Sequence, residues 1–260
     1  MNDMRTVSSI RGFAVTIAII GVAILTGSCA DANSSPAAAN LTGSPSQPSD
    51  TSARILEAVD SPRLTRVDVK GPIAEVTGQA ALTPGDASRT LWYATVAGTA
   101  LAQAQGLESI ERIVLDPSGS ELDSERDPLT ALTNDAGPFA PLTLSSSDIQ
   151  SQVDSEAASL GVTILDVHYV ALYGGTAEIV VQPNDVVKFV GSAGSDVNTL
   201  LGSLGQDRRP YLVTIVDGEG APQLLLSFVA GIGGTNGQGM AWAAPGAQTD
   251  AILGMPQVDS

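Results

Sequence analysis

The sequence has little of what most catalytic and metal sites are built from. Its 260 residues include one cysteine and one histidine, aromatic residues make up 4%, and Lys plus Arg number 12 against 28 Asp plus Glu. One cysteine excludes a disulfide within the chain, and one histidine excludes a zinc site unless carboxylates supply the other ligands. The formal net charge of −16 argues against nucleic-acid binding, which needs clustered basic residues. No Gly-rich phosphate-binding motif and no G-x-S-x-G motif occurs. We therefore expect no cofactor, no resident metal and no nucleic-acid partner.

The single cysteine stands at the end of an apolar run. Arg5 and Arg11 precede the run, residues 13–25 are almost wholly apolar, and small residues follow. These are the three regions of a secretory signal peptide. The run is shorter than the roughly 20 apolar residues that a membrane-spanning helix needs. Residues 1–28 are therefore predicted to be a cleaved signal peptide.

The residues around the cysteine, Thr26-Gly27-Ser28-Cys29, resemble the lipobox of bacterial lipoproteins. The family usually has Leu where Thr26 stands, and Gly or Ala where Ser28 stands. The resemblance implies that Cys29 is diacylated on its sulfur and becomes the first residue of the mature chain. Two acyl chains suffice for stable anchoring, which would place the protein on the outer face of the cell membrane. The alternatives are secretion after cleavage behind Ala32, in an A-x-A-like site, and an uncleaved helix.

Beyond the cysteine, composition divides the chain into segments. Residues 29–52 are rich in Ser, Pro and Ala, with almost no apolar side chain to bury, which predicts a flexible tether. Two α+β repeats are expected at 53–117 and 147–244, joined by a polar connector at 118–146. The tail 245–260 is expected to be disordered.

Each predicted repeat has the same order of elements. The first reads as a helix, a hairpin, a helix and a strand, at residues 53–59, 64–70, 73–79, 86–106 and 109–115. The second reads in the same order and adds a terminal hairpin, with elements at residues 147–160, 162–173, 176–182, 185–204, 211–217 and 223–229. Past Val229 the chain is too Gly-rich for regular structure to be expected.

The two repeats also match residue by residue. Five positions align without a gap at a constant separation of 103 residues, namely Gly71/Gly174, Ala74/Ala177, Glu75/Glu178, Val76/Ile179 and Gln79/Gln182. Asp86, predicted as a helix N-cap, then corresponds to Asp185, and Asp116 corresponds to Asp217. The predicted fold class is α+β, with tandem αββαβ units, largely antiparallel sheets and helices packed on one face.

Residues 53–115 resemble the BON module of bacterial envelope proteins, in their turn-G-x-A-E-V strand followed by a capped, Ala-rich helix. The resemblance implies association with phospholipid or with envelope partners. The acidity of this chain departs from what binding to anionic lipid favours.

Two stretches are candidates for chemistry. Asp166 and His168 alternate along a predicted strand, so that with Ile164, Val170 and Leu172 they share one face, and an Asp–His pair is one way to orient a general base. Residues 116–127 place oxygen ligands at the spacing of a calcium loop, but Glu121 stands where the sharp turn needs Gly. The alternative, purely structural interpretations are a half-buried histidine paired with or near an acid, and a solvated acidic loop.

These observations favour a membrane-anchored extracytoplasmic lipoprotein that acts as a non-enzymatic binding, accessory or scaffold module of the cell envelope. Its expected partners are the membrane, through the lipid on Cys29, and an envelope protein or small ligand. The alternative is a tethered or secreted hydrolase that uses Asp166 and His168.

Overall fold

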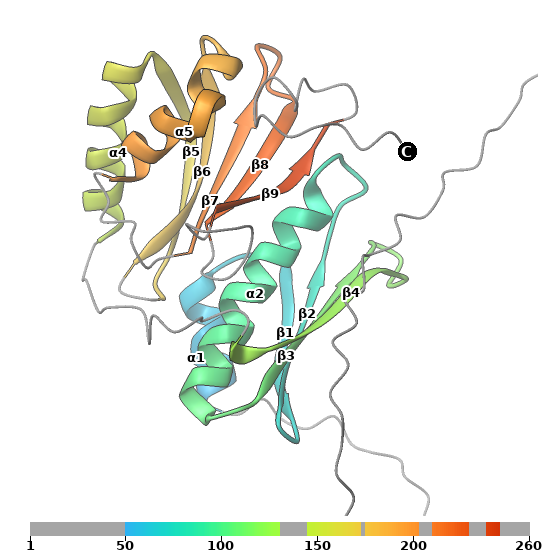
Figure 1. Cartoon of the computed structure of the whole chain (residues 1–260). Coiled ribbons are helices and arrows are strands. Elements are labelled where there is room, and N and C mark those ends of the chain that lie inside the picture. The colour runs from blue at the N-terminus through green and yellow to red at the C-terminus, as the bar shows by residue number, and fades with distance from the viewer. Residues whose placement is uncertain (1–49, 131–144, 173–174, 203–209, 229–237, 245–260) are drawn as a thin grey trace, which may run out of the picture. The chain divides into compact units, whose positions relative to one another are not determined.

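The structure is a computed structural model (Figure 1) that describes residues 50–130, 145–172, 175–202, 210–228 and 238–244. The predicted signal peptide, the tether up to residue 49 and the tail 245–260 lie outside these residues. The first half contains two helices and four strands: α1 (Asp50–Val59), β1 (Leu64–Lys70), β2 (Ile73–Gln79), α2 (Asp86–Gln105), β3 (Ser109–Leu115) and β4 (Glu121–Pro128). The second half contains two helices and five strands: α4 (Ser146–Leu160), β5 (Val162–Val170), β6 (Thr176–Pro183), α5 (Val186–Gly202), β7 (Tyr211–Val216), β8 (Pro222–Phe228) and β9 (Gln238–Ala243).

The strands form two sheets with the same topology. The first sheet has the order β1-β2-β3-β4 and the second has the order β5-β6-β7-β8-β9. In each sheet one pair is parallel, β2 with β3 and β6 with β7, and every other pair is antiparallel. A helix connects the two strands of each parallel pair, as a parallel crossover requires. The fold is therefore α+β, as predicted.

Two strands were not expected from the sequence. Residues 121–128, expected within the connector, form β4 at the edge of the first sheet. Residues 238–243, expected to be irregular, form β9 at the edge of the second sheet. The repeating unit is therefore αββαββ rather than αββαβ. The strand predicted at residues 162–173 is also shorter, because β5 ends at Val170.

The correspondence between the halves extends to irregular positions. The register of the β1–β2 hairpin shifts between Leu64 and Arg66, and that of β5–β6 shifts between Ile164 and Asp166. The turns after β3 and β7 are both closed by an aspartate. Asp116 Oδ1 accepts hydrogen bonds from the N–H groups of Ser118 and Ser120, and Asp217 Oδ1 accepts from those of Glu219 and Ala221. Shared bulges and turns support the internal duplication more strongly than the order of elements alone.

Helix α2 packs against both sheets. Its sequence is apolar or small on nearly every side, and all residues from Trp92 to Thr99 are buried, as expected for a helix without a solvated face. Towards the first sheet, a Cβ atom on Gly98 would lie only 3.2 Å from Val76. The core cluster that contains the buried residues of α2 also includes Val170, Leu212 and Leu225 of the second half. The first core is therefore completed by the second repeat.

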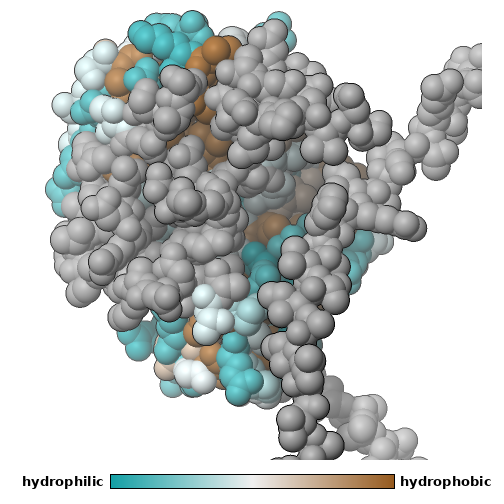
Figure 2. All heavy atoms as spheres, in the orientation of Figure 1, coloured by the Kyte–Doolittle hydropathy of each residue, from teal (hydrophilic) through white to brown (hydrophobic). Residues whose placement is uncertain are grey.

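Helices α4 and α5 form a separate core with the second sheet. Ile149, Val153 and Ala157 recur at helical spacing along the buried side of α4. The outward side of this helix is hydrophilic (Figure 2, upper left), with Ser151 and Asp154 among its exposed residues.

The start of α2 differs from the prediction. Gly85 is the N-cap residue, in the left-handed conformation with φ 76°, and no side chain caps this end. Asp86 is instead buried, where it accepts a hydrogen bond from the N–H of Ala81 at 2.6 Å and pairs with Arg63. At the equivalent place before α5, Asp185 Oδ1 does accept from the N–H of Lys188, at 3.0 Å. The predicted N-cap role of Asp86 is therefore wrong, although the corresponding Asp185 does bind a backbone N–H at the start of its helix.

Candidate functional site

Cys29, the predicted lipidation site, lies outside the described residues, so its modification remains a prediction. No helix in the described ranges is long and apolar enough to cross a membrane. Among the same residues, no three His, Cys, Asp or Glu side chains gather closely enough to hold a metal ion.

The predicted Asp166–His168 pair lies on β5, but the two side chains have different surroundings. Asp166 is exposed, whereas His168 is half buried, with Nε2 at 3.0 Å from the carbonyl oxygen of Val59. The imidazole also meets the Tyr93 ring edge to face, with 5.5 Å between ring centroids. Within the described part of the chain, no hydrogen bond joins Asp166 to His168. The histidine therefore ties β5 to α1 and α2.

The shared face predicted for β5 is interrupted by its bulge. Ile164 pairs with Val181 and packs against the second core, whereas Val170 belongs to the first core. The register shift after Ile164 turns this residue to the opposite face from His168.

Residues 116–127, the candidate calcium loop, form a tight turn and a strand. The Asp116 carboxylate accepts hydrogen bonds from the side chain and N–H of Ser118 and from the N–H of Ser120. These bonds hold the pKa of Asp116 below its usual value. Residues from Glu121 onward are extended in β4, and an extended chain does not wrap around a cation as a twelve-residue calcium loop does.

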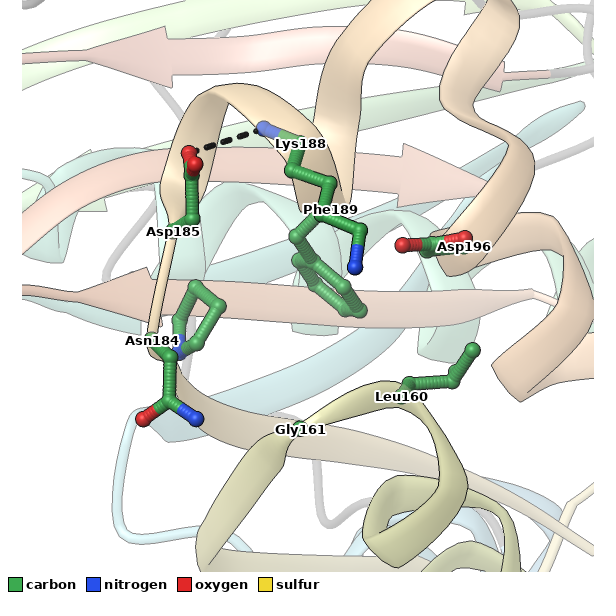
Figure 3. Close-up of a pocket in the computed structure, with 8 residues that line it drawn as sticks. Leu160, Gly161, Asn184, Asp185, Lys188, Phe189 and Asp196 are labelled. Atoms are coloured by element: carbon green, nitrogen blue, oxygen red, sulfur yellow. Dashed lines mark hydrogen bonds between the residues drawn. The ribbon is translucent and has the colours of Figure 1, made fainter.

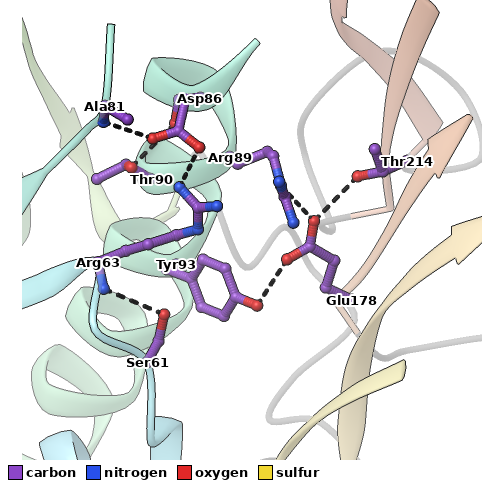
Figure 4. A network of polar contacts seen from close by, with 9 residues as sticks. All are labelled: Ser61, Arg63, Ala81, Asp86, Arg89, Thr90, Tyr93, Glu178 and Thr214. Carbon is purple, nitrogen blue, oxygen red and sulfur yellow. Dashed lines mark hydrogen bonds and ion pairs between the residues drawn. The ribbon is translucent and has the colours of Figure 1, made fainter. Parts of the chain in front are cut away.

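A buried polar cluster joins the two repeats (Figure 4). Glu178, on β6, is 2% exposed and accepts hydrogen bonds from Arg89 Nε at 2.5 Å, Tyr93 Oη at 2.8 Å and Thr214 Oγ1 at 3.0 Å. Arg89 and Tyr93 lie one turn apart on α2, so both reach the same carboxylate. The cluster therefore links α2 of the first repeat to two strands of the second.

The electrostatics of the cluster follow from burial of its charges. Burial raises the pKa of the Tyr93 hydroxyl, and the charge and hydrogen bond of Glu178 raise it further, so Tyr93 stays protonated as a donor. Burial alone would lower the pKa of Arg89, but the hydrogen bond and charge of Glu178 outweigh it and the pKa is raised. The stability of such an ion pair depends on its hydrogen bonds, because burial removes most of the hydration of both charges.

The matched residue in the first repeat, Glu75, has a different environment. It is also 2% exposed, but its partners are Arg66 and Lys70 on the neighbouring strand β1. The alignment of Glu75 with Glu178 was visible in the sequence, but the burial of both carboxylates and their partners was not. Arg89, Tyr93 and Thr214 carried no sequence signal that set them apart.

A small pocket lies where α4 ends and α5 begins (Figure 3). It is lined by Leu160, Gly161, Pro183, Asn184, Asp185, Lys188, Phe189 and Asp196. Its volume of about 130 Å³ is below the roughly 300–1,000 Å³ typical of ligand sites. The Asp185 carboxylate accepts a hydrogen bond from the N–H of Lys188 at the start of α5, so this N–H is not available to a bound anion.

Comparisons with known proteins add no family. No protein-family model and no curated protein matches the chain. Among solved structures, the C-terminal domain of the sex pheromone staph-cAM373 precursor from Staphylococcus aureus aligns with 69% of this chain and 69% of its own, at 13% identity and a TM-score of 0.21. A TM-score this low does not establish a common fold.

Proposed function

We propose that the protein is a membrane-anchored extracytoplasmic lipoprotein whose folded part is a non-enzymatic binding, accessory or scaffold module of the cell envelope. The observation that carries this proposal is the sequence Thr26-Gly27-Ser28-Cys29 at the end of an apolar run. In this arrangement two acyl chains on Cys29 hold the protein at the membrane.

The tether and the charge fit such a role. The tether predicted at residues 29–52 has some twenty residues. If it is flexible, as its composition predicts, its end-to-end distance is on the order of 25 Å, which would keep the domain clear of the head groups. The net charge of −16 keeps the domain from adhering to anionic lipid. The membrane would therefore hold the protein through its anchor alone.

The polar groups that were candidates for chemistry, or that are buried, make contacts within the fold. His168 contacts Val59 and Tyr93, Glu178 holds the repeats together, and Asp116 closes a turn. Each of these groups contributes to the fold through its contacts.

Lipidation is tested by replacing Cys29 with Ala in the full chain expressed in a bacterial host. We expect the wild-type protein to incorporate radiolabelled palmitate and to sediment with membranes, and Cys29→Ala to lose both properties. Ser28→Ala is a matched control, because it restores a preferred lipobox residue and should be processed at least as well as the wild type. Wild-type protein found free in the medium, with its N-terminus after Ala32, would contradict the proposal. Membrane-bound Cys29→Ala would instead indicate an uncleaved helix.

A further inference from the structure

The two sheets differ at one edge. In the second sheet, β8 pairs with β9 in antiparallel register, with Leu224 opposite Ala243 and Leu225 opposite Trp242. In the first sheet, β4 occupies the position of β8, after the same aspartate-closed turn, and the strand order ends there. Within the described residues, nothing pairs with the outer edge of β4 (Figure 1). The second sheet therefore shows that the repeat accommodates a fifth strand at this edge, and none of the described strands takes that place in the first sheet.

The hydrogen-bonding direction of β4 can be assigned from its register. The N–H of Leu129 donates to the carbonyl of Glu108, at 2.8 Å, so this pair bonds inward to β3. Antiparallel pairs alternate, so Asp127, Glu125 and Asp123 also bond inward. The N–H and C=O groups of Ser124 and Arg126 then face away from β3, whereas Leu122 lies at the bulge between Asp123 and Glu121, where the alternation is broken. Pro128, which has no N–H, falls at one of these outward positions, where β3 does not need a donor.

The charge of β4 is suited to a basic partner strand. Asp123, Glu125 and Asp127 share one face of the strand, since they lie opposite Val114, Arg112 and Ile110 of β3. Among the residues that the structure describes, only Arg112 pairs with this row, through Glu125 at 2.8 Å and Asp127. Burial raises the pKa of Glu125; Arg112 opposes the rise, and Asp123 and Asp127 add to it. The row is therefore short of positive charge.

The same acidic row disfavours a second copy of this chain as the partner. Antiparallel pairing of two β4 strands would set carboxylates against carboxylates, and like charges opposite each other destabilise a strand pair. An extended segment with Lys or Arg at alternate positions meets the opposite sign at each step.

We propose that β4 accepts an extended segment of a partner protein as a fifth, antiparallel strand of the first sheet, and that this segment carries basic residues facing Asp123, Glu125 and Asp127. The inference rests on the proposed function as a binding module and names the chemistry of its partner. Backbone hydrogen bonds to Ser124 and Arg126 supply the pairing, and the acidic row supplies selectivity.

The test uses the purified full chain and a blocked seven-residue peptide that alternates Lys and Val, labelled for fluorescence anisotropy. We expect saturable binding that weakens with salt, and slower hydrogen–deuterium exchange at the amides of Ser124 and Arg126. A peptide that alternates Glu and Val should not bind.

Two sets of variants separate backbone pairing from charge. Ser124→Pro removes an outward N–H and should abolish binding, whereas Ser124→Ala keeps that N–H and should bind as the wild type does. Asp123→Asn should weaken binding roughly two- to fivefold, as expected for one lost cross-strand charge pair. Asp154→Asn, on α4, removes the same charge elsewhere and should change binding much less. Both charge variants alter exposed side chains, so they remain informative if Ser124→Pro does not fold.

Equal binding of the Glu/Val peptide, unchanged exchange at the two outward amides, or full binding by folded Ser124→Pro would overturn the proposal. Protection of those amides without peptide, rising with protein concentration, would identify a second copy as the partner and would overturn it too. Peptide binding does not depend on the acyl anchor, and palmitate labelling of Cys29 does not depend on β4. The inference and the proposed function can therefore fail separately.

Discussion

At the scale of single residues, Glu178 is the side chain on which the contact between the repeats depends most. Glu178→Gln keeps the shape of the side chain but leaves the Arg89 guanidinium, 21% exposed, without its counter-charge. We expect a loss of about 2–3 kcal/mol in the free energy of unfolding, somewhat below the usual cost of breaking a fully buried pair. Urea unfolding followed by tryptophan fluorescence measures it.

The duplication provides a control for this substitution. Glu75→Gln changes the matched residue, whose partners Arg66 and Lys70 are 48% and 56% exposed and can be hydrated when the carboxylate charge is lost. We expect a smaller loss, of about 1 kcal/mol. Equal losses in the free energy of unfolding at the two positions would mean that the contacts between the repeats do not make Glu178 more stabilising than Glu75.

Sequence reasoning reached these residues only in part. The alignment of Glu75 with Glu178 predicted their equivalence, but a charged residue on a strand is ordinarily assigned to a solvated face. The burial of Glu178 depends on a helix 85 residues away in the sequence, and no local pattern reports such a contact. His168 was predicted to be half buried and paired with or near an acid; it is half buried, lies opposite Glu178 in the β5–β6 register, and contacts Val59 and Tyr93.

At the scale of elements, the start of α2 offers a test that separates the sequence-based prediction from the structure. If Asp86 were an N-cap, Asp86→Ser would be nearly neutral, because Ser caps helices about as well as Asp. In the structure Asp86 pairs with Arg63 in a buried site, and Ser cannot replace that charge. We therefore expect Asp86→Ser to cost about 3 kcal/mol, as much as Asp86→Ala.

The control for this prediction lies at the equivalent helix of the second repeat. Asp185 is exposed and does cap α5, so Asp185→Ser should change the free energy of unfolding little. Thermal or urea unfolding of these three variants compares the two positions. A nearly neutral Asp86→Ser would show that the Arg63 pair contributes nothing beyond capping.

The elements that the sequence predicted well are those with a periodic apolar pattern. The hairpin at 64–70 and 73–79 has the predicted limits, because alternating residues flank a Gly-Pro turn. Strand β4 was missed because nearly all its residues are exposed and polar, which leaves no alternation to detect. Strand β9 was missed because glycines precede and enter it, and its pairing with β8 gives no local signal. Both are edge strands, which are defined by their neighbour rather than by their own sequence.

At the scale of the whole molecule, the sharing of a core between the repeats has a consequence for unfolding. Val170, Leu212 and Leu225 of the second half complete the core around α2, and Glu178 accepts hydrogen bonds from that helix. Unfolding of either half therefore removes apolar contacts and an ion-pair partner from the other half. Although the sequence predicts two repeats, we expect them to unfold as one cooperative unit.

The chain contains two tryptophans, one in each repeat, which makes this prediction measurable. Trp92 lies in α2 and Trp242 in β9, so the variants Trp242→Phe and Trp92→Phe each leave one probe, in the first and second half respectively. Urea unfolding of the two variants should show one transition each, and introducing Glu178→Gln should lower both midpoints together because the cluster belongs to both halves. Global stability differs slightly between the two Phe backgrounds, so each shift is measured against its own parent. A transition that moves for one probe and stays fixed for the other would show that the repeats fold independently, and that the contacts between them contribute little to stability.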